Sequence, residues 1–438
     1  MLLEGLLSVY NVVWFMINGY NIYPVVKGAL VRDRKGSDEE AYRRYAQRTV
    51  DWPKVSVLVP AYHEVGVLER CIRNLRGSNY PKDRLELIIL TEMDDRDTSE
   101  IAQRCVRKYQ TRHVYIKDTG EPRGKPRALK QGLKHAEGEI VGVIDAEDIT
   151  DPDLFRHVAF EIKEKGHDAI QGKLDMSNDA DGWKNAQFRA EYGFWYNHYL
   201  PHLARSRLPI PLGGTTNFFK KSVLEKIDDW DACNLTEDFE LGLRLYSLDS
   251  EQGATSRGYS VGVFNSVTRE ESPLTWRGWI RQRTRWQRGK IQTLRKVMKS
   301  PRGGMAKRYN SFMACIAPHT AIVNVTGIIA FLYAALNNVV LPLPMMMLSY
   351  FNLATILYYC IRQGAGYLKA TEDEEDSLRR TKAFILAVTL PVYWVFLWVA
   401  DFRALKQEYL DKRIFWEKTE HSGRNLLYTL IFAKVLSR

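Results

Sequence analysis

The sequence predicts an α/β domain joined to an α-helical membrane region. From Val55 to about Asn265, short β-branched runs alternate with helix-like segments, which is the pattern of a mostly parallel sheet covered by helices. Residues 309–361 contain no Asp, Glu, Lys or Arg. At ~1.5 Å per residue this stretch is long enough to cross a bilayer core of ~30 Å twice. The 438 residues are 45% hydrophobic and 26% charged, which excludes a disordered or fibrous chain.

The first element is an uncharged stretch, residues 5–26, which predicts an N-terminal membrane anchor helix over residues 1–30. No basic residue precedes it and no small-residue cleavage site follows, so it resembles a retained anchor more than a signal peptide. Asn11, Asn18 and Asn21 interrupt its apolar character. The alternative is therefore a helix that lies flat at the lipid headgroups.

The α/β domain is expected over residues 50–270. Its predicted strands are Val55–Val59, ended by Pro60, then Leu85–Leu90 and Ile140–Ile144, with a helix over Val67–Arg76 after the first. In open α/β sheets, ligands bind beyond the carboxyl ends of the strands. Polar residues that directly follow these strands are therefore candidate site residues.

Two acidic groups follow predicted strands. Asp94 and Asp95 come after the second strand, where they either cap the next helix or bind a ligand. Asp145 and Glu147 follow the third strand, and their carboxylates could bind Mg²⁺ or Mn²⁺, which prefer oxygen ligands and commonly bridge substrate phosphates.

Two further motifs place charged residues where they could bind a substrate or act as a base. The run from Arg123 to Arg127 could meet a diphosphate, although surface loops often have this composition. Thr236, Glu237 and Asp238 open a predicted helix, where Thr is a good N-cap and acids favour the first turn. In a functional interpretation, one of these carboxylates is a general base.

The segment 271–308 is expected to form amphipathic helices on the membrane surface. Between Arg277 and Arg308 it holds twelve basic residues, interleaved with tryptophans, and no acidic residue. Basic and aromatic residues also suit nucleic acid, but a patch next to a membrane span favours anionic lipid, and we expect no nucleic-acid partner. Two transmembrane helices are expected over 309–362.

The remaining segments are assigned from charge. Lys and Arg flank the apolar stretches at Arg32, Arg34 and Lys35 and again at Arg302, Lys307 and Arg308, which predicts a cytoplasmic catalytic domain in a multi-pass protein of the cell membrane. Residues 381–403, with Pro391 in their apolar centre, are expected to form a membrane, re-entrant or interfacial helix. Residues 404–438 are expected to be a cytoplasmic tail with an amphipathic helix. Five scattered cysteines agree with a reducing compartment.

Together these motifs resemble the membrane-embedded family 2 glycosyltransferases, the group of cellulose, chitin and hyaluronan synthases. The resemblance is carried, in order, by Pro60–Glu64, Asp94–Asp95, Lys125–Leu129, Asp145–Glu147, Gly213–Asn217, Thr236–Asp238, Gln282–Trp286 and Trp416–His421. His63 stands where Asn is usual, and Glu147 replaces the second Asp of an Asp-x-Asp motif. The resemblance implies a GT-A fold, which is Rossmann-like, and a C-terminal gating loop.

The resemblance also implies roles for individual residues. Asp238 would be the catalytic base, beside Glu237 and Thr236 of its motif. The nucleotide sugar would contact Pro60, Tyr62, Glu64, Asp94, Asp95, Lys125, Arg127, Asp145, Gln282, Arg285, Lys418 and Thr419. The acceptor would contact Gly214, Thr215, Asn217 and Trp286, and Asp145 and Glu147 would hold Mg²⁺ or Mn²⁺.

The expected reaction is inverting transfer from a nucleotide-diphosphate sugar, of the UDP type, to a growing β-linked polysaccharide. The alternative is transfer of a single sugar to a lipid, as in ceramide glucosyltransferases, because about two spans and an anchor are few for a polymer channel. A membrane-docked scaffold with a vestigial site is a third possibility, which the retained Asp238, Gln282, Arg285 and Trp286 disfavour. A transporter is disfavoured because the apolar segments hold no ionisable Asp, Glu, Lys or Arg.

Overall fold

The fold is described from a computed structural model, which defines residues 2–30, 35–47, 51–248 and 258–411. Its sheet has the order β3-β2-β1-β4-β7-β6-β8-β5. The strands are β1 (Val55–Ala61), β2 (Leu85–Glu92), β3 (Arg112–Ile116), β4 (Ile140–Val143), β5 (Ile149–Thr150), β6 (Ala169–Met176), β7 (Asn217–Lys220) and β8 (Val261–Glu270). The three strands predicted from β-branched runs are β1, β2 and β4, each extending to within two residues of its expected end.

The sheet is mostly parallel, as expected, but two of its strands, β5 and β7, run against the others. Strands β3, β2, β1 and β4 are parallel, and so are β6 and β8, but β7 runs antiparallel to both β4 and β6, and β5 antiparallel to β8. The direction of β7 follows from its connection. The segment between β6 and β7 begins and ends on the carboxyl side of β6, so the chain re-enters the sheet in the opposite direction.

Helices cover both faces of the sheet, which explains why its central strands are apolar on both sides. Val57 and Val59 of β1 point into one core with α3 (Leu68–Arg76), α4 (Arg96–Tyr109) and α6 (Leu154–Ala159). Leu58 points into the other with α5 (Lys125–Leu133), α8 (Leu200–Ser206), α9 (Lys221–Lys226) and α10 (Glu237–Ser247). This alternation is the two-residue period of a strand.

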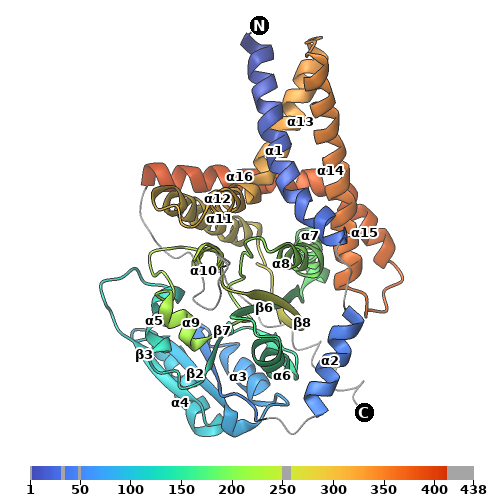
Figure 1. The fold of residues 1–438 in the computed structure, drawn as a ribbon. Helices are drawn as coiled ribbons and strands as arrows, with labels where there is room; N and C mark the ends of the chain where they lie inside the picture. Colours follow the sequence, from blue (N-terminus) through green and yellow to red (C-terminus); the bar gives the residue numbers. More distant parts are fainter. Residues whose placement is uncertain (1, 31–34, 48–50, 249–257, 412–438) are drawn as a thin grey trace.

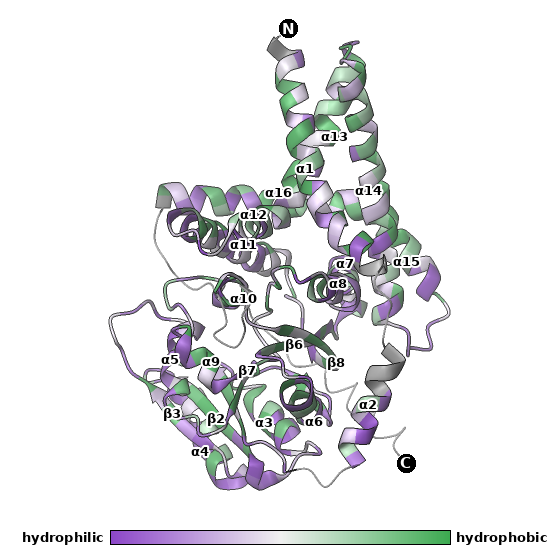
Figure 2. Cartoon of the chain, viewed as in Figure 1, coloured by the Kyte–Doolittle hydropathy of each residue, from purple (hydrophilic) through white to green (hydrophobic). Residues whose placement is uncertain are grey.

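Above the sheet lie helices that are long and apolar enough to cross a membrane. Within the described residues, two pass this test: Met305–Leu336, formed by α12 (Met305–Ile316) and α13 (Thr320–Leu336), and α14 (Leu343–Ala370). Figure 2 shows apolar residues along α13 and α14, which project away from the sheet domain. Large apolar side chains such as Leu336, Leu343 and Met347 are 65% exposed or more, as expected for surfaces that face lipid.

Helix α1 (Leu2–Leu30) lies alongside α13 and α14 (Figure 1). It is not among the helices apolar enough to be counted as spans. The asparagines that interrupt its apolar stretch are buried against these neighbours: Asn21 donates to the Ala317 carbonyl, and Asn18 donates to Asn324. The polar residues of α1 therefore fasten it to the first candidate span and the short turn within it.

The last two helices form a bent pair. Helix α15 (Arg379–Val388) and α16 (Leu390–Lys406) meet at 55°, with Pro391 in the first turn of α16. Counted as one, they would make a third span. In Figure 1, α16 runs across the base of α13 and α14 and along α11 (Trp276–Lys299). Helix α16 therefore lies crosswise to α13 and α14.

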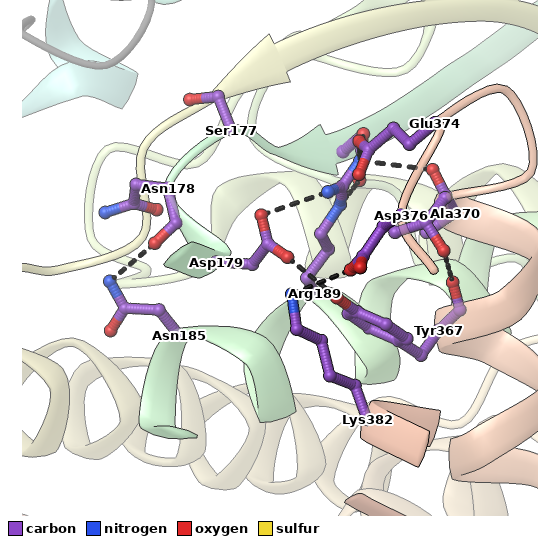
Figure 3. Close-up of polar contacts among 12 residues, drawn as sticks. Ser177, Asn178, Asp179, Asn185, Arg189, Tyr367, Ala370, Glu374, Asp376 and Lys382 are labelled. Atoms are coloured by element: carbon purple, nitrogen blue, oxygen red, sulfur yellow. Dashed lines mark hydrogen bonds and ion pairs between the residues drawn. The ribbon is translucent and has the colours of Figure 1, made fainter. Parts of the chain in front are cut away.

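A buried ionic cluster joins the membrane helices to the sheet domain (Figure 3). Its centre is Arg189 of α7 (Trp183–Phe194), which donates to both carboxylate oxygens of Asp175 at 3.0 and 2.9 Å and to Asp179 at 3.0 Å. The same guanidinium reaches the loop after α14, where it donates to Glu374 at 2.6 Å and to the Ala370 carbonyl at 3.1 Å. Earlier in the chain, helix α2 (Lys35–Gln47) lies between α1 and β1.

Candidate active site

A cavity of about 760 Å³ lies between the carboxyl ends of the strands, helices α7, α10 and α11, and the membrane helices. Most of the residues singled out from the sequence line it: Pro60, Tyr62, Glu64, Lys125, Asp145, Glu147, Gly214, Thr215, Thr236, Glu237, Asp238, Gln282, Arg285 and Trp286. The fold thus brings segments that are far apart in the chain to one edge of the sheet, where α/β ligand sites form.

At the centre of this cavity, Lys125 connects two of the expected motifs. Its ammonium group forms an ion pair with Asp145 and donates to the Gly214 carbonyl at 2.7 Å. Burial alone would lower the pKa of Lys125, but the charges of Asp145, Glu237 and Asp238 outweigh it and raise the pKa. Lys125 is therefore a fixed cation beside these carboxylates.

Asp238 and Glu237 begin helix α10 and differ in environment. Asp238 is half-buried, and its Oδ1 accepts the backbone N–H of Phe239 at 2.8 Å. A Cβ built on Gly214 would lie 3.5 Å from Asp238 Oδ2 and 3.4 Å from Lys125 Nζ, so the glycine keeps the space between these two groups open. Burial raises the pKa of both acids, and with the Asp238 charge it raises the pKa of Glu237 to about 8. With a pKa of about 8, Glu237 is mostly protonated at neutral pH and is therefore a poor candidate for the base.

Helix α11 packs closely against this motif. A Cβ on Gly289 would lie 2.2 Å from the Thr236 Oγ1, so only glycine allows the helix to approach so near. The approach places Arg285 beside the acids: its pKa is lowered by burial, while the charges of Glu237, Asp238 and Asp145 oppose that shift. Lys125 and Arg285 are thus two cations at the same end of the cavity.

The donor set at this end fits a divalent cation. Asp145 and Glu147 line the cavity together with Glu270, the last residue of β8. Burial, followed by repulsion from Glu147 and Asp145, raises the pKa of Glu270 to about 8, so the site is short of positive charge. In the described part of the chain, no group of three His, Cys, Asp or Glu side chains is arranged to bind a metal by itself. Substrate phosphates would have to supply the remaining ligands, as is common for Mg²⁺.

Four predicted residues do not line the cavity. Asp95 is a buried N-cap that accepts from Thr98 N at 3.2 Å, and the exposed Asp94 pairs with Arg123 at 2.8 Å. Arg127 is buried, and its Nη2 donates to both carboxylate oxygens of Glu92 at 3.0 and 2.9 Å. Asn217 lies in β7, where its side chain bonds the Gly213 carbonyl. Lys418, Thr419 and the expected gating loop lie outside the described residues.

Two cavity features were missed in the sequence. Glu270 is the last residue of β8, a strand that was not among those predicted, so the rule that selected Asp145 did not reach it. Arg283 could not have been found this way, because its partners come from distant elements: it forms a bidentate pair with Glu191 of α7 at 2.7 Å and stacks on Trp286, with its guanidinium carbon 4.7 Å from the ring centroid. This pair fixes the tryptophan predicted to contact the acceptor.

The other end of the cavity reaches the membrane helices. Its walls there include Asn21 of α1, Tyr359 and Arg362 of α14, and Trp394 and Leu397 of α16. One continuous space therefore connects Asp238 with side chains that belong to the membrane region.

Comparison with known proteins gives a consistent result. Residues 53–289 match the family model described as "Glycosyltransferase like family 2". The chain is 30% identical over 258 residues to the probable glycosyltransferase YdaM of Bacillus subtilis, covering 56% of this chain but only 57% of YdaM. It is 25% identical over 388 residues to a beta-monoglucosyldiacylglycerol synthase of Synechocystis, covering 86% of this chain and 76% of the relative.

Two further similarities are informative. A poly-beta-1,6-N-acetyl-D-glucosamine synthase of Staphylococcus epidermidis is 24% identical over 241 residues, or 55% of this chain and 55% of the relative. Among solved structures, a mannosyltransferase of Pyrobaculum calidifontis, in complex with GDP-Man and Mn²⁺, superposes with a TM-score of 0.55 at 17% identity, over 93% of this chain and 100% of that one. This likeness supports the GT-A fold expected from the sequence.

Proposed function

The chain belongs to glycosyltransferase family 2, whose members use nucleotide sugars, and on this basis we propose that it transfers one sugar, with inversion, to a lipid in the membrane. The observation that carries the proposal is the single cavity that joins Asp238 to side chains of α1, α14 and α16. A lipid held among these helices could place a hydroxyl group beside the donor sugar.

Asp238 is the proposed general base. Its carboxylate would accept the proton of the acceptor hydroxyl while that oxygen attacks the anomeric carbon from the face opposite the diphosphate. The carbon–oxygen bond to the diphosphate breaks in the same step, so an α-linked donor gives a β-linked product. The raised pKa of Glu237, about 8, keeps that neighbour mostly neutral at pH 7, which disfavours Glu237 as the base.

The leaving diphosphate gains negative charge as the bond breaks. Lys125 and Arg285, both in the cavity, are placed to stabilise that charge. Asp145 and Glu147 would hold a Mg²⁺ or Mn²⁺ ion, which when bound supplies further positive charge to the diphosphate. Tyr62, with the guanidinium carbon of Arg123 4.4 Å from its ring centroid, is placed on the donor side.

The length of the similarity supports a lipid acceptor. Alignment with the glycolipid synthase extends over 86% of this chain and so includes membrane helices, whereas alignment with the polysaccharide synthase covers 55%. The two or three candidate spans among the described residues also offer few helices for a channel. A polysaccharide acceptor is the second candidate, and Trp286, whose ring borders the cavity, favours it as a stacking surface for a sugar.

We also propose that the sheet domain faces the cytoplasm. Arg302, Lys307 and Arg308 stand immediately before the apolar part of the first span, and short basic flanks mark the cytoplasmic side. In this orientation α16 and α11 lie along the inner membrane surface. The described part of the tail, through residue 411, would then be cytoplasmic.

The test is to give the purified full chain, in lipid with Mn²⁺ or Mg²⁺, a panel of nucleotide sugars labelled in the sugar, and to separate products between organic solvent and water. Label in the organic phase would support the lipid acceptor, and a large water-phase or insoluble polymer would refute it. Asp238→Asn should lower kcat by about 10²- to 10⁴-fold, the usual contribution of general base catalysis, while donor affinity is kept. Full activity of that variant would refute the base assignment.

A further inference from the structure

Arg362 places a cation at the membrane end of the cavity. It lies on α14 inside one of the two candidate spans, is half-buried and lines the cavity. A charged residue within a membrane segment is costly, and it usually faces a polar cavity and a partner of opposite charge. Arg362 is therefore expected to have a partner of opposite charge.

The contacts of Arg362 are aromatic. Its guanidinium carbon lies 3.0 Å from the ring centroid of Phe194 and 4.9 Å from that of Tyr358. Nη1 donates to the Tyr358 hydroxyl at 3.1 Å, and Nε is buried without a hydrogen-bond partner. In the described ranges of the chain, no carboxylate forms an ion pair with Arg362.

Other buried arginines of this protein do have carboxylate partners. Arg189 pairs with three carboxylates, Arg283 with Glu191, and Arg288 with Glu408 at 2.7 Å. Arg283 is the close comparison, because it also stacks on aromatic rings and yet has a bidentate carboxylate partner. Arg362 has the stacking without the carboxylate, although it lines the cavity.

We infer that Arg362 binds the phosphate group of an anionic lipid acceptor. Guanidinium is suited to phosphate because its planar donors can form paired, charge-assisted hydrogen bonds. A phospholipid whose headgroup carries a free hydroxyl would place its phosphate at Arg362, its chains among α1, α14 and α16, and its hydroxyl toward Asp238. The inference rests on the proposed lipid acceptor and specifies its class, since a neutral diacylglycerol has nothing for Arg362 to bind.

The test compares two lipids that share short acyl chains and a free hydroxyl but differ in charge: dioctanoyl phosphatidylglycerol and dioctanoylglycerol. Binding to the full chain in a phosphate-free alkyl maltoside micelle is measured by calorimetry, and sugar transfer to each lipid is measured in parallel. Arg362→Gln should weaken phosphatidylglycerol binding at least about tenfold, as expected for a lost charge-assisted hydrogen bond, and leave dioctanoylglycerol unchanged. Arg362→Lys, which keeps the charge but not the planar stacking, should recover part of the affinity.

Arg380→Gln is the matched control, because Arg380 lies on α15, is exposed and does not line the cavity. Equal effects of Arg362→Gln on both lipids, or none on either, would overturn the phosphate assignment. Competition by glycerol 1-phosphate as strong as that by the lipid would move the site to a soluble phosphate ester and overturn the lipid source. Failure of transfer to both lipids would instead count against the proposed function, while the binding results would still decide the role of Arg362.

Discussion

Replacement of Arg189 by Met tests how the membrane helices are held on the sheet domain (Figure 3). Met keeps much of the side-chain volume and removes the guanidinium. Two of the three carboxylates around it can adapt: Glu374 is 48% exposed and can be hydrated, and Asp179 keeps a bond from the Tyr367 hydroxyl at 3.1 Å. Asp175 cannot adapt, because it is buried and both its oxygens bond Arg189.

The expected loss of folding stability follows from the protonation of Asp175 in the variant. Burial already raises its pKa, although Arg189 opposes that shift, and without Arg189 the carboxyl will take up a proton in the folded state. At pH 7, protonating a carboxyl with an ordinary pKa of about 3.9 costs about 4 kcal/mol. This agrees with the roughly 3–5 kcal/mol lost when a buried ion pair loses one partner. At pH 5 the same proton costs only about 1.5 kcal/mol.

The raised pKa fixes the direction of the pH dependence. When a carboxyl has a higher pKa in the folded state, the protein becomes less stable as pH rises above the ordinary pKa of that carboxyl. The stability lost by the variant relative to wild type should therefore grow from pH 5 to pH 7. For 438 residues, an unfolding entropy of roughly 2.1 cal/mol/K per residue converts the two costs into a Tm lowered by about 4 °C and about 2 °C.

The assay is thermal unfolding of the full chain in lipid nanodiscs at both pH values. Arg189→Met combined with Asp175→Asn should recover most of the loss, because the orphaned charge is gone. Lys382→Met is the matched control: its ion pair with Asp376, in the same loop region, is partly exposed and should contribute under about 1 kcal/mol. A loss below about 1 °C at pH 7, or equal losses at the two pH values, would refute the reasoning.

Three further predictions concern the cavity. Glu237→Gln should leave activity at pH 7 near wild type and remove the decline expected above pH 8, where ionisation of Glu237, with its pKa of about 8, adds negative charge beside the diphosphate; a pH–rate profile unchanged by the variant would contradict this. Asp145→Ala should abolish metal-dependent donor binding in calorimetry, and binding that stays tight and metal-dependent would place the cation elsewhere. Gly289→Ala should displace Thr236, which lies 2.2 Å from the added Cβ, and lower kcat more than tenfold; wild-type kcat would show that α11 can move away without affecting Asp238.

The parts of the fold that could be predicted are those with a local signal. Buried β-branched runs located β1 and β2, and the absence of charge over 309–361 located the two spans. The antiparallel direction of β7 had no such signal, because it depends on the route of the chain through α7 and α8. The position of α16 across the base of the spans likewise depends on packing against α11 and is not encoded in its own apolar sequence.

The same distinction applies to the site. Acids that directly follow strands were found at Asp145 and Glu147, and motif resemblance added Asp238 and Trp286, all of which line the cavity. Asp95 was ambiguous in sequence because an acid before a helix serves equally as ligand or N-cap, and here it is the cap. Pairs such as Glu191 with Arg283 lie far apart in the chain, so no spacing rule indicates them.

Helix α7 holds the Asp238 end and the Arg362 end of the cavity at a constant distance from each other. Phe188, Glu191 and Tyr192, at helical spacings of three and four, line the cavity, and Glu191 fixes α11 through Arg283. Arg189, on the adjacent face of the same helix, fixes the loop after α14. Helix α7 is therefore bonded both to α11, which carries Trp286, and to the end of α14, which carries Arg362. A lipid that binds at Arg362 and reacts near Asp238 requires this spacing to be constant, and the buried ion pairs of α7 are the contacts that hold it constant.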